Sequence, residues 1–209
     1  MIFDIHALQE RFYFGDSVVP VLESAIPLLI RKMEAMSAEF FDITTKEFQS
    51  FTIAFPDEGA YLRYHSLFPK YEQIICAKVR EGTKRKITVK EGNPVGKQCI
   101  LVDDMIQSGG TLLECGKMLK SMGAAEVFAF CAHGVFPNQA WKKFVGGPFK
   151  KVWVTDSCPK SAEELTGHEP FEVLSLAPLI ADLLDANVGR HTDYHAVPKR
   201  GERHMISRL

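Results

Sequence analysis

Short runs rich in Val, Ile, Phe and Cys alternate along this chain with segments of helical periodicity. The apolar runs predict strands at residues 51–54, 74–78, 98–102, 126–132, 152–155 and 171–176. Between them, hydrophobic residues recur at helical spacing over residues 60–68, 111–122, 138–144 and 160–165. Near-continuous apolar strands that alternate with helices are typical of a parallel sheet covered on both faces. The pattern therefore predicts an α/β fold with a doubly wound, mostly parallel sheet.

Two more helices are expected outside this alternation. The first covers residues 18–36, with Pro20 near its start and a kink at Pro27, because proline removes a backbone donor. The second covers residues 177–186. These two helices extend the predicted fold toward both ends of the chain.

Two segments are too polar to belong to the core. Residues 81–92 carry several Lys and Arg side chains between two glycines, which predicts an exposed hairpin or a flexible arm. From residue 189 the chain becomes polar and basic and loses periodicity. We therefore expect one domain over residues 1–188, followed by a poorly ordered tail over residues 189–209.

Composition narrows the classes of function. Lys and Arg total 25 against 26 Asp and Glu, so the formal net charge is -1 and gives no general attraction for nucleic acid or acidic membranes. Glycine, proline and amide residues interrupt the apolar-looking stretch 127–141, and the N-terminus lacks a signal pattern, so neither a membrane span nor secretion is expected. The five scattered cysteines contain no C-x-x-C pair, which favours a cytoplasmic location without structural zinc.

The strongest chemical signal follows the strand at 98–102. Two adjacent acids, Asp103 and Asp104, precede a short loop that opens a helix. The loop residues are Gln107, Ser108, Gly109, Gly110 and Thr111. Glycines allow backbone N–H groups to approach an anion closely, and the first helical turn adds unpaired N–H groups and the positive end of the helix dipole. Such a loop is suited to hold a phosphate.

The two acids define the rest of the ligand. Asp103 and Asp104 would repel a bare anion, but they accept hydrogen bonds from hydroxyl groups and they attract Mg²⁺. A sugar phosphate therefore satisfies both parts of the segment. The alternative is purely structural, with an Asp helix cap and a glycine-rich turn, and it fits a single Asp or Gly-Gly better than this whole pattern. Neither a G-x-G-x-x-G fingerprint nor a complete P-loop is present.

Four segments in register resemble one family. Residues 99–111 resemble the phosphoribosyl-diphosphate (PRPP) binding loop that type I phosphoribosyltransferases share with PRPP synthetases. The sequence DIHALQ at 4–9, FPDEGA at 55–60 and KVR at 78–80 resemble three further synthetase motifs, in the family's order. The similarity runs from residue 4 to about residue 186 and is greatest to the class II, plant-type synthetases. The resemblance implies a type I phosphoribosyltransferase-like fold for the predicted domain.

The resemblance also implies an activity. PRPP synthetases, or ribose-phosphate diphosphokinases, transfer a diphosphate from Mg-ATP to the 1-hydroxyl of ribose 5-phosphate and produce PRPP and AMP. By position, the family pattern assigns the ribose hydroxyls to Asp103 and Asp104, and the 5-phosphate to residues 107–111. It assigns the transferring group to the catalytic pair Lys78 and Arg80. It implies Mg²⁺ as cofactor, and the family generally forms homo-oligomers.

The chain has two further positions that match the family pattern and two features that differ from it. The family's Mg²⁺-binding His and Asp correspond to His6 and Asp57. The family's loop often has Asp-Thr where this chain has Gln107-Ser108, which lowers the local negative charge by one. No segment matches the family's N-terminal, adenine-binding half, so we expect a fragment or half-enzyme that turns over ATP poorly by itself. Two alternatives stay open: a phosphoribosyltransferase that uses PRPP, and a non-catalytic subunit associated with a PRPP synthetase.

Overall fold

The computed structural model describes residues 1–37, 41–42, 47–48, 51–81 and 84–192. The chain divides into two compact units, Met1–Leu176 and Ala177–Leu209. Helix α5 (Ala177–Thr192) is the described part of the second unit. The predicted tail lies almost wholly outside the described residues, so the boundary at residue 188 stays a prediction.

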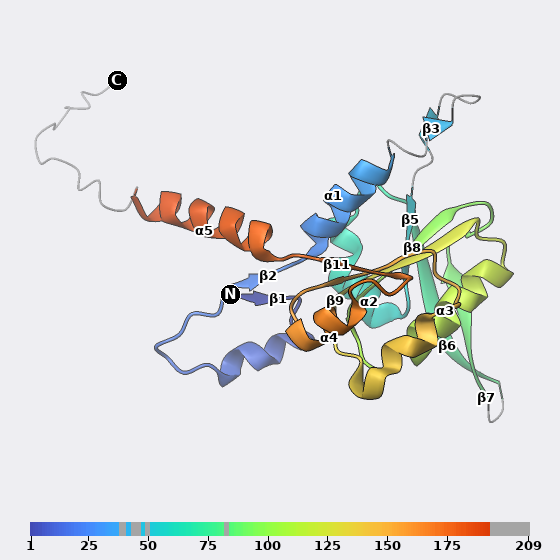
Figure 1. The fold of residues 1–209 in the computed structure, drawn as a ribbon, viewed down its shortest axis with the longest axis horizontal. Coiled ribbons are helices and arrows are strands. Elements are labelled where there is room, and N and C mark those ends of the chain that lie inside the picture. The colour runs from blue at the N-terminus through green and yellow to red at the C-terminus, as the bar shows by residue number, and fades with distance from the viewer. Residues whose placement is uncertain (38–40, 43–46, 49–50, 82–83, 193–209) are drawn as a thin grey trace, which may run out of the picture. The chain divides into compact units, whose positions relative to one another are not determined.

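The first unit contains a seven-stranded sheet (Figure 1). Its strands are β5 (Phe51–Phe55), β6 (Gln73–Glu81), β7 (Lys84–Glu91), β8 (Gln98–Ile106), β9 (Glu126–Gly134), β10 (Val152–Thr155) and β11 (Phe171–Leu174). Their spatial order is β11-β10-β9-β8-β5-β6-β7, and every neighbouring pair is parallel except β6 and β7. This confirms the expected α/β fold with a mostly parallel sheet.

The strand order reverses at the centre of the sheet. From β5 the chain runs outward to β6 and β7, returns to β8 beside β5, and then continues in the other direction to β11. In open α/β sheets, ligands bind beyond the carboxyl ends of the strands at such a reversal. The topology therefore predicts a ligand-binding site at the carboxyl ends of β5 and β8.

Helices and short strands complete the first unit. The helices are η1 (Leu8–Tyr13), α1 (Ile26–Ser37), α2 (Glu58–Tyr64), η2 (His65–Leu67), α3 (Gly110–Ser121), η3 (Pro137–Phe144) and α4 (Pro159–Leu165). Two short ladders lie outside the main sheet, formed by β1 (Ile2–Phe3) with β2 (Leu22–Glu23) and by β3 (Phe41–Asp42) with β4 (Glu47–Phe48).

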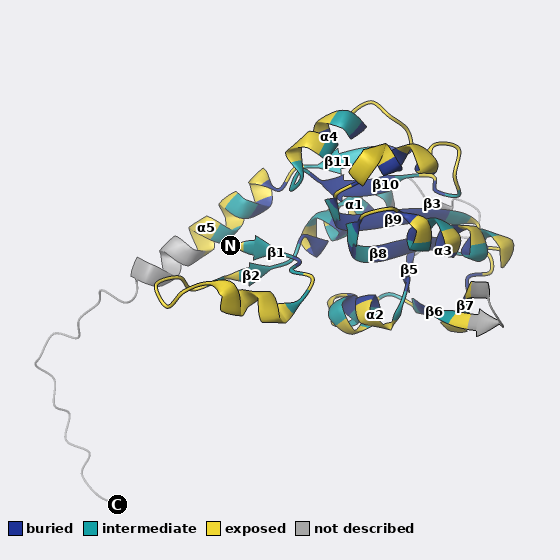
Figure 2. Ribbon diagram, turned by 90° about the horizontal axis from the view of Figure 1, so that it is seen from below, coloured by how far each residue is buried: buried dark blue, intermediate teal, exposed yellow. Residues whose placement is uncertain are grey.

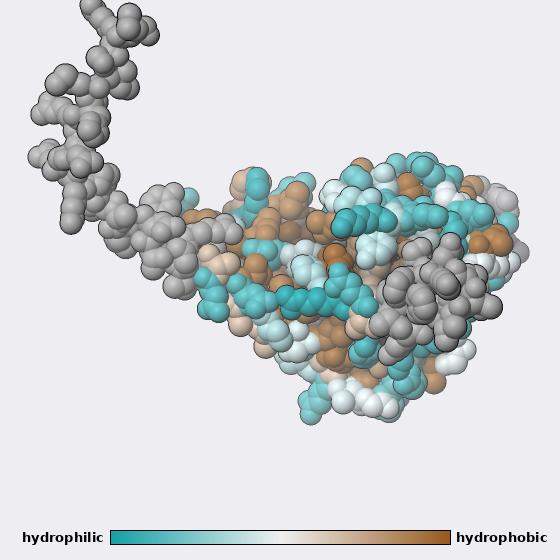
Figure 3. Space-filling model, turned by 90° about the horizontal axis from the view of Figure 1, so that it is seen from above, coloured by the Kyte–Doolittle hydropathy of each residue, from teal (hydrophilic) through white to brown (hydrophobic). Residues whose placement is uncertain are grey.

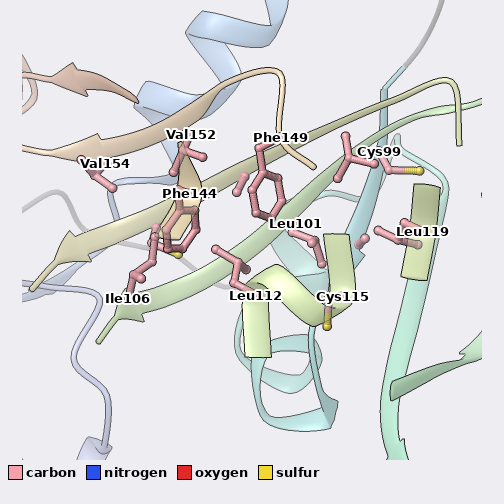
Figure 4. Packing of buried hydrophobic residues seen from close by; sticks show 14 of the residues in the cluster. Cys99, Leu101, Ile106, Leu112, Cys115, Leu119, Phe144, Phe149, Val152 and Val154 are labelled. Carbon is pink, nitrogen blue, oxygen red and sulfur yellow. The ribbon is translucent and has the colours of Figure 1, made fainter. Parts of the chain in front are cut away.

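Both faces of the central strands are buried, as Figure 2 shows for β8, β9 and β10. Successive residues of a strand point to opposite faces, and in β8 every residue from Gln98 to Val102 is buried. On one of these faces α3 packs Leu112, Cys115 and Leu119 into the core cluster (Figure 4). Fully covered strands explain why the sequence reads as apolar runs instead of alternating polar and apolar positions.

The predicted helix over residues 18–36 is wrong in its first half. The chain is extended around β2, and α1 begins only at Ile26. Asp4 fixes this start, because its carboxylate accepts hydrogen bonds from the Ser24 hydroxyl at 2.7 Å and from the Ala25 amide at 2.7 Å. Pro27 therefore stands in the first turn of the helix, where its missing N–H has no cost, and it is not a kink.

Two further predictions concern the segments 138–144 and 81–92. The first is a 3-10 helix whose early residues Asn138 and Gln139 have left-handed backbone angles, with φ of 54° and 57°. The second belongs to an antiparallel hairpin, in which β6 pairs with β7. The hairpin alternative of the prediction is thus confirmed for its described residues. Its register shifts between Ile75 and Cys76.

Two findings bear on the environment of the chain. Within the described residues, none of the helices is both long and apolar enough to cross a membrane. All five cysteines are free thiols, and four of them are buried.

On the face shown in Figure 3, hydrophobic residues reach the surface in patches between hydrophilic ones.

Candidate functional site

A cavity of about 880 Å³ opens where the strand order reverses. Asp57, which follows β5 after Pro56, and the acids near the end of β8 contribute to its wall. The predicted site residues that line this cavity are His6, Asp57, Lys78, Asp103, Asp104, Gln107, Ser108, Gly109, Gly110 and Thr111. Residues as far apart in the sequence as His6 and Asp104, 98 positions, therefore meet in one place. The backbone of Arg80 lies on β6 opposite Arg85, and its side chain is outside the described residues.

The glycine-rich loop has a backbone that only glycine tolerates. Gly109 precedes α3 with a φ of 74°, in the left-handed region. A Cβ atom at this position would lie 2.4 Å from Cε2 of Phe144, a fully buried ring. The carbonyl of Gly109 accepts the first helical hydrogen bond, from Leu113 at 2.9 Å. The loop thus packs closely against the core. The N–H groups of the first turn of α3, which have no partner within the helix, lie at the cavity.

Asp104 is the centre of a buried charge network. Its side chain is 3% exposed, and its Oδ2 atom lies 2.5 Å from Nδ1 of His6 and 3.1 Å from Nη1 of Arg63. Arg63 also donates from Nη2 to the backbone carbonyl of His6 at 2.8 Å. The arginine therefore ties the N-terminal segment to the end of β8. A buried carboxylate requires partners of this kind to remain ionised.

The two neighbouring acids have opposite pKa shifts. Burial raises the pKa of Asp103 to about 7, and the hydrogen bond and negative charge of Asp104 add to the shift. Burial also acts to raise the pKa of Asp104, but hydrogen bonds with His6 and Asp103 and the charge of Arg63 outweigh it and lower this pKa. The pair thus shares one proton near neutral pH, with the charge on Asp104.

Asp57 and Lys78 form the other side of the cavity. Asp57 caps α2 by accepting from the Ala60 amide at 3.1 Å, and its second oxygen accepts from Nζ of Lys78 at 3.1 Å. Burial acts to raise the pKa of Asp57, but these two hydrogen bonds and the lysine charge lower it below its usual value. Asp57 is therefore an ionised carboxylate with a cation beside it, and both side chains line the cavity.

Sequence reasoning missed Arg63, a charged residue that lines the cavity. Arg63 sits in the last turn of α2, and the signal for it was the short helix that follows the Asp57 cap. His133 also lines the cavity, and both of its ring nitrogens have structural partners, the Ser157 hydroxyl at 2.8 Å and the Phe3 carbonyl at 2.9 Å. His133 therefore holds β1 beside β9, which helps to place His6.

The fold and cavity define a class of protein. A doubly wound sheet, a phosphate-type loop after β8 and paired acids at the strand reversal are the features of a phosphoribosyltransferase-like fold. Residues 70–185 match the family described as the phosphoribosyl synthetase-associated domain. Because this match covers more than half of the chain, the chain belongs to that family.

Known proteins that resemble the chain are consistent with this family. Ribose-phosphate pyrophosphokinase 4 of Oryza sativa subsp. japonica is 47% identical over 191 residues, which are 88% of this chain and 56% of that protein. The mitochondrial ribose-phosphate pyrophosphokinase 3 of Spinacia oleracea is 47% identical over 189 residues, 87% of this chain and 44% of that protein. The chain thus spans about half the length of these curated relatives.

A solved structure supports the same fold. The phosphoribosylpyrophosphate synthetase of Mycobacterium smegmatis superimposes with a TM-score of 0.67 and 25% sequence identity, over 90% of this chain and 58% of that chain. The similarity therefore covers nearly all of the present chain. It confirms the resemblance to PRPP synthetases that the four sequence motifs indicated.

Proposed function

We propose that this chain is the catalytic half of a ribose-phosphate diphosphokinase that binds ribose 5-phosphate. The observation that carries the proposal is the single cavity in which the loop at 107–111, the acids of β8 and Lys78 meet. The names and the similarity of the relatives support it. The reaction would move a diphosphate from Mg-ATP to the 1-hydroxyl of the sugar and release AMP.

The sugar phosphate fits the β8 side of the cavity. The 5-phosphate would accept hydrogen bonds from backbone amides at Gly109 to Thr111 and from the hydroxyls of Ser108 and Thr111. Ribose hydroxyls would donate to Asp103 and Asp104. The contacts of Asp104 with His6 and Arg63 both fall on Oδ2. Sugar binding would favour ionised Asp103, because hydroxyl donors stabilise the carboxylate.

The opposite side of the cavity would handle the transferring group. Lys78 already lies at the cavity, and Arg80 is two residues further along β6. Phosphoryl transfer needs mainly positioning and positive charge around the phosphoryl oxygens, which an ammonium and a guanidinium supply. Both residues are carried by the hairpin of β6 and β7, so that a movement of this element would bring them to the nucleotide.

The donor set also fits Mg²⁺. Within the described residues there is no group of three or more His, Cys, Asp and Glu side chains that could enclose a metal. Mg²⁺ usually keeps several waters and binds through one or two carboxylates together with substrate phosphates. Asp57 and His6 are the side chains that would hold it, and it would neutralise charge on the phosphoryl oxygens.

Calorimetry and phosphorus NMR test this proposal directly. The folded chain should bind ribose 5-phosphate in the presence of Mg²⁺, and it should release AMP from ATP slowly unless a nucleotide-binding lobe is supplied. A flat titration with folded protein would contradict the proposal. Pyrophosphate release from PRPP and a nucleobase would instead identify a phosphoribosyltransferase. Binding of the sugar phosphate without turnover in the complete assembly would identify a non-catalytic subunit.

We further infer a reducing compartment, because all five cysteines are free thiols. The cytoplasm stays a prediction, since some relatives carry the word mitochondrial or chloroplastic in their names. Assembly into a homo-oligomer also stays a prediction. Cell fractionation and sedimentation of the purified chain would examine these two points.

A further inference from the structure

Two of the described residues that line the cavity are histidines, and their ring nitrogens are used differently. In His133, Nδ1 lies 2.8 Å from the Ser157 hydroxyl and Nε2 lies 2.9 Å from the Phe3 carbonyl. In His6, Nδ1 lies 2.5 Å from Oδ2 of Asp104, and no described residue forms a hydrogen bond with Nε2. The His6 side chain is also 59% exposed. His6 is therefore the cavity histidine that has a ring nitrogen open to a ligand.

The hydrogen bond between His6 and Asp104 has a defined direction. Oδ2 of Asp104 also lies 3.1 Å from Nη1 of Arg63. A guanidinium can only donate and always carries its charge, so it holds Oδ2 as a negatively charged acceptor. Nδ1 of His6 must then be the donor. Because a neutral imidazole carries one N–H, its lone pair lies on Nε2.

A buried anchor holds an exposed ring in this arrangement. The side chain of Asp104 is 3% exposed, so its carboxylate has little freedom to move. Arg63 also donates from Nη2 to the backbone carbonyl of His6 at 2.8 Å, so the main chain and the ring of His6 are fixed together. Since Nδ1 and Nε2 lie on different sides of the ring, fixing Nδ1 also sets the direction of Nε2. Histidines that bind a metal usually donate their other ring N–H in this way, often to a carboxylate.

We propose that Asp104 is a positioning residue, which holds His6 in the Nδ1–H tautomer so that Nε2 is the nitrogen that would bind a divalent cation. The family pattern assigns only the ribose hydroxyls to Asp104, so this role is additional. The inference rests on the proposed function, because it adds a carboxylate behind one of the two side chains that would hold Mg²⁺. It also gives Arg63 a part in the site, as the group that keeps Oδ2 an acceptor.

Nitrogen NMR of histidine-labelled protein tests the tautomer without any ligand, at about pH 8, where histidine is ordinarily neutral. The wild type should show His6 as the Nδ1–H form and His133 as the Nε2–H form, because the Phe3 carbonyl can only accept. His6→Ala identifies the His6 signals. In Asp104→Ala both tautomers of His6 should appear, while His133 stays unchanged. Asp103→Ala is the matched control, since it removes the neighbouring acid of the same cavity and should leave the His6 tautomer as it is.

The conservative variant Asp104→Asn separates positioning from charge. Its amide oxygen can take the place of Oδ2 and accept from Nδ1, although it carries no negative charge. We therefore expect Asp104→Asn to keep most of the Nδ1–H form of His6. A His6 spectrum that changes as much in Asp104→Asn as in Asp104→Ala would contradict the proposal.

Mn²⁺ is the probe for the cation, and its binding is followed by electron paramagnetic resonance and by broadening of the histidine signals. Bound Mn²⁺ should broaden Nε2 of His6 more than Nδ1. Asp104→Ala should weaken Mn²⁺ binding about tenfold, which is typical for loss of a residue that orients a metal ligand. In the His6→Ala background the same substitution should cause little further loss, because Asp104 acts through His6. A carboxylate that acted only by its charge would give the same loss in both backgrounds.

The remaining outcomes are equally decisive. An Nε2–H form of His6 in the wild type would overturn the proposal, and this measurement does not depend on whether Asp104→Ala folds. Equal losses of Mn²⁺ affinity with and without His6 would overturn it as well. Ribose 5-phosphate separates the two proposals. If Mn²⁺ binds at Nε2 but the sugar ester does not bind, the proposed function fails and this inference stands. If the sugar ester binds while Mn²⁺ leaves His6 unchanged, this inference fails alone.

Discussion

The two sides of the cavity are built with different degrees of burial. On the β8 side, Asp104 is 3% exposed and is held by His6 and Arg63. On the hairpin side, Asp57 is 41% exposed and its partner Lys78 is 26% exposed. A buried, hydrogen-bonded group keeps one geometry, whereas a half-exposed ion pair is weak and exchanges partners easily. The comparison predicts that the proposed sugar site is formed before a ligand arrives, while the cations on the hairpin would rearrange around a bound nucleotide.

The largest effect is expected at the rigid side, from Gly109→Ala. The new Cβ would overlap Phe144 in a backbone conformation that alanine resists, and we expect a loss of about 2–4 kcal/mol in stability. Ribose 5-phosphate binding should fall below detection. Gly110→Ala is the matched control, because its nearest contact would be 3.9 Å away at Ser108. Urea unfolding of both variants measures the difference, and equal midpoints would contradict the rigid-loop description.

A smaller and more selective effect is expected at the hairpin side, from Lys78→Ala. The Mg²⁺ complex of PRPP carries a diphosphate that ribose 5-phosphate lacks, and Lys78 is proposed to contact that group. We therefore expect the affinity of the variant for Mg²⁺-PRPP to fall about tenfold or more. The affinity for ribose 5-phosphate should not change. Lys90→Ala controls for the hairpin itself, because Lys90 pairs with Glu58 on an exposed surface. Calorimetry with both ligands would show the selectivity, and equal losses for both would erase the distinction between the two sides.

Arg63→Gln should destabilise the chain by about 1–3 kcal/mol, since it leaves buried Asp104 with one charged partner fewer. The pKa of Asp104 should rise as well. Arg63→Lys should recover part of the loss, because it restores the charge without the second contact to the His6 carbonyl. Urea unfolding at pH 7 checks the order of the three proteins. A Gln variant as stable as the wild type would show that the network does not hold the N-terminal segment.

The smallest effect is expected from the shared proton, in Asp103→Asn. The folded pKa of Asp103 is raised to about 7, above the unfolded value, so its contribution to stability is full below about pH 4 and is lost as pH rises through 7. The Asn variant should therefore gain about 1–2 kcal/mol relative to the wild type between pH 5 and pH 8. Urea unfolding at pH 5 and pH 8 measures this difference in stability, with Glu58→Gln as an exposed control. A constant difference would contradict the raised pKa.

Much of the fold was predictable because the central strands are buried on both faces. Continuous apolar runs are the signal of such strands, and all six predicted runs are strands in the structure. β7 was only partly visible, since its sequence KRKITVKE is mostly charged. Charged side chains are common on the edge strand of a sheet, where they discourage pairing with other chains. The same charges hide the strand from a search for apolar alternation.

The start of α1 shows a second limit of sequence reasoning. Hydrophobic residues before Ile26 extend the helical pattern toward the N-terminus. The helix nevertheless begins only at Ile26, because Asp4 accepts hydrogen bonds from Ser24 and Ala25. This contact joins residues about 20 positions apart, so local periodicity contains no trace of it. The site also combines local and long-range features. Its acids and glycines could be predicted from one loop, whereas the contact of Arg63 with Asp104 depends on the direction of α2 relative to β8. Roles assigned to these residues stay predictions until binding is measured.

The register shift in the hairpin determines which changes of chain length this protein can accept. Ile75 faces Glu91 and Cys76 faces Val89, so Lys90 is an extra residue on β7. Side chains alternate between the two faces of a strand, and this extra residue sets which of them point inward, including buried Ile87. Deleting Lys90 would invert the inside and outside of the outer strand, although replacing its side chain would not. Within the paired part of this hairpin, natural relatives should therefore vary by two residues at a time, and an odd insertion should coincide with a second bulge.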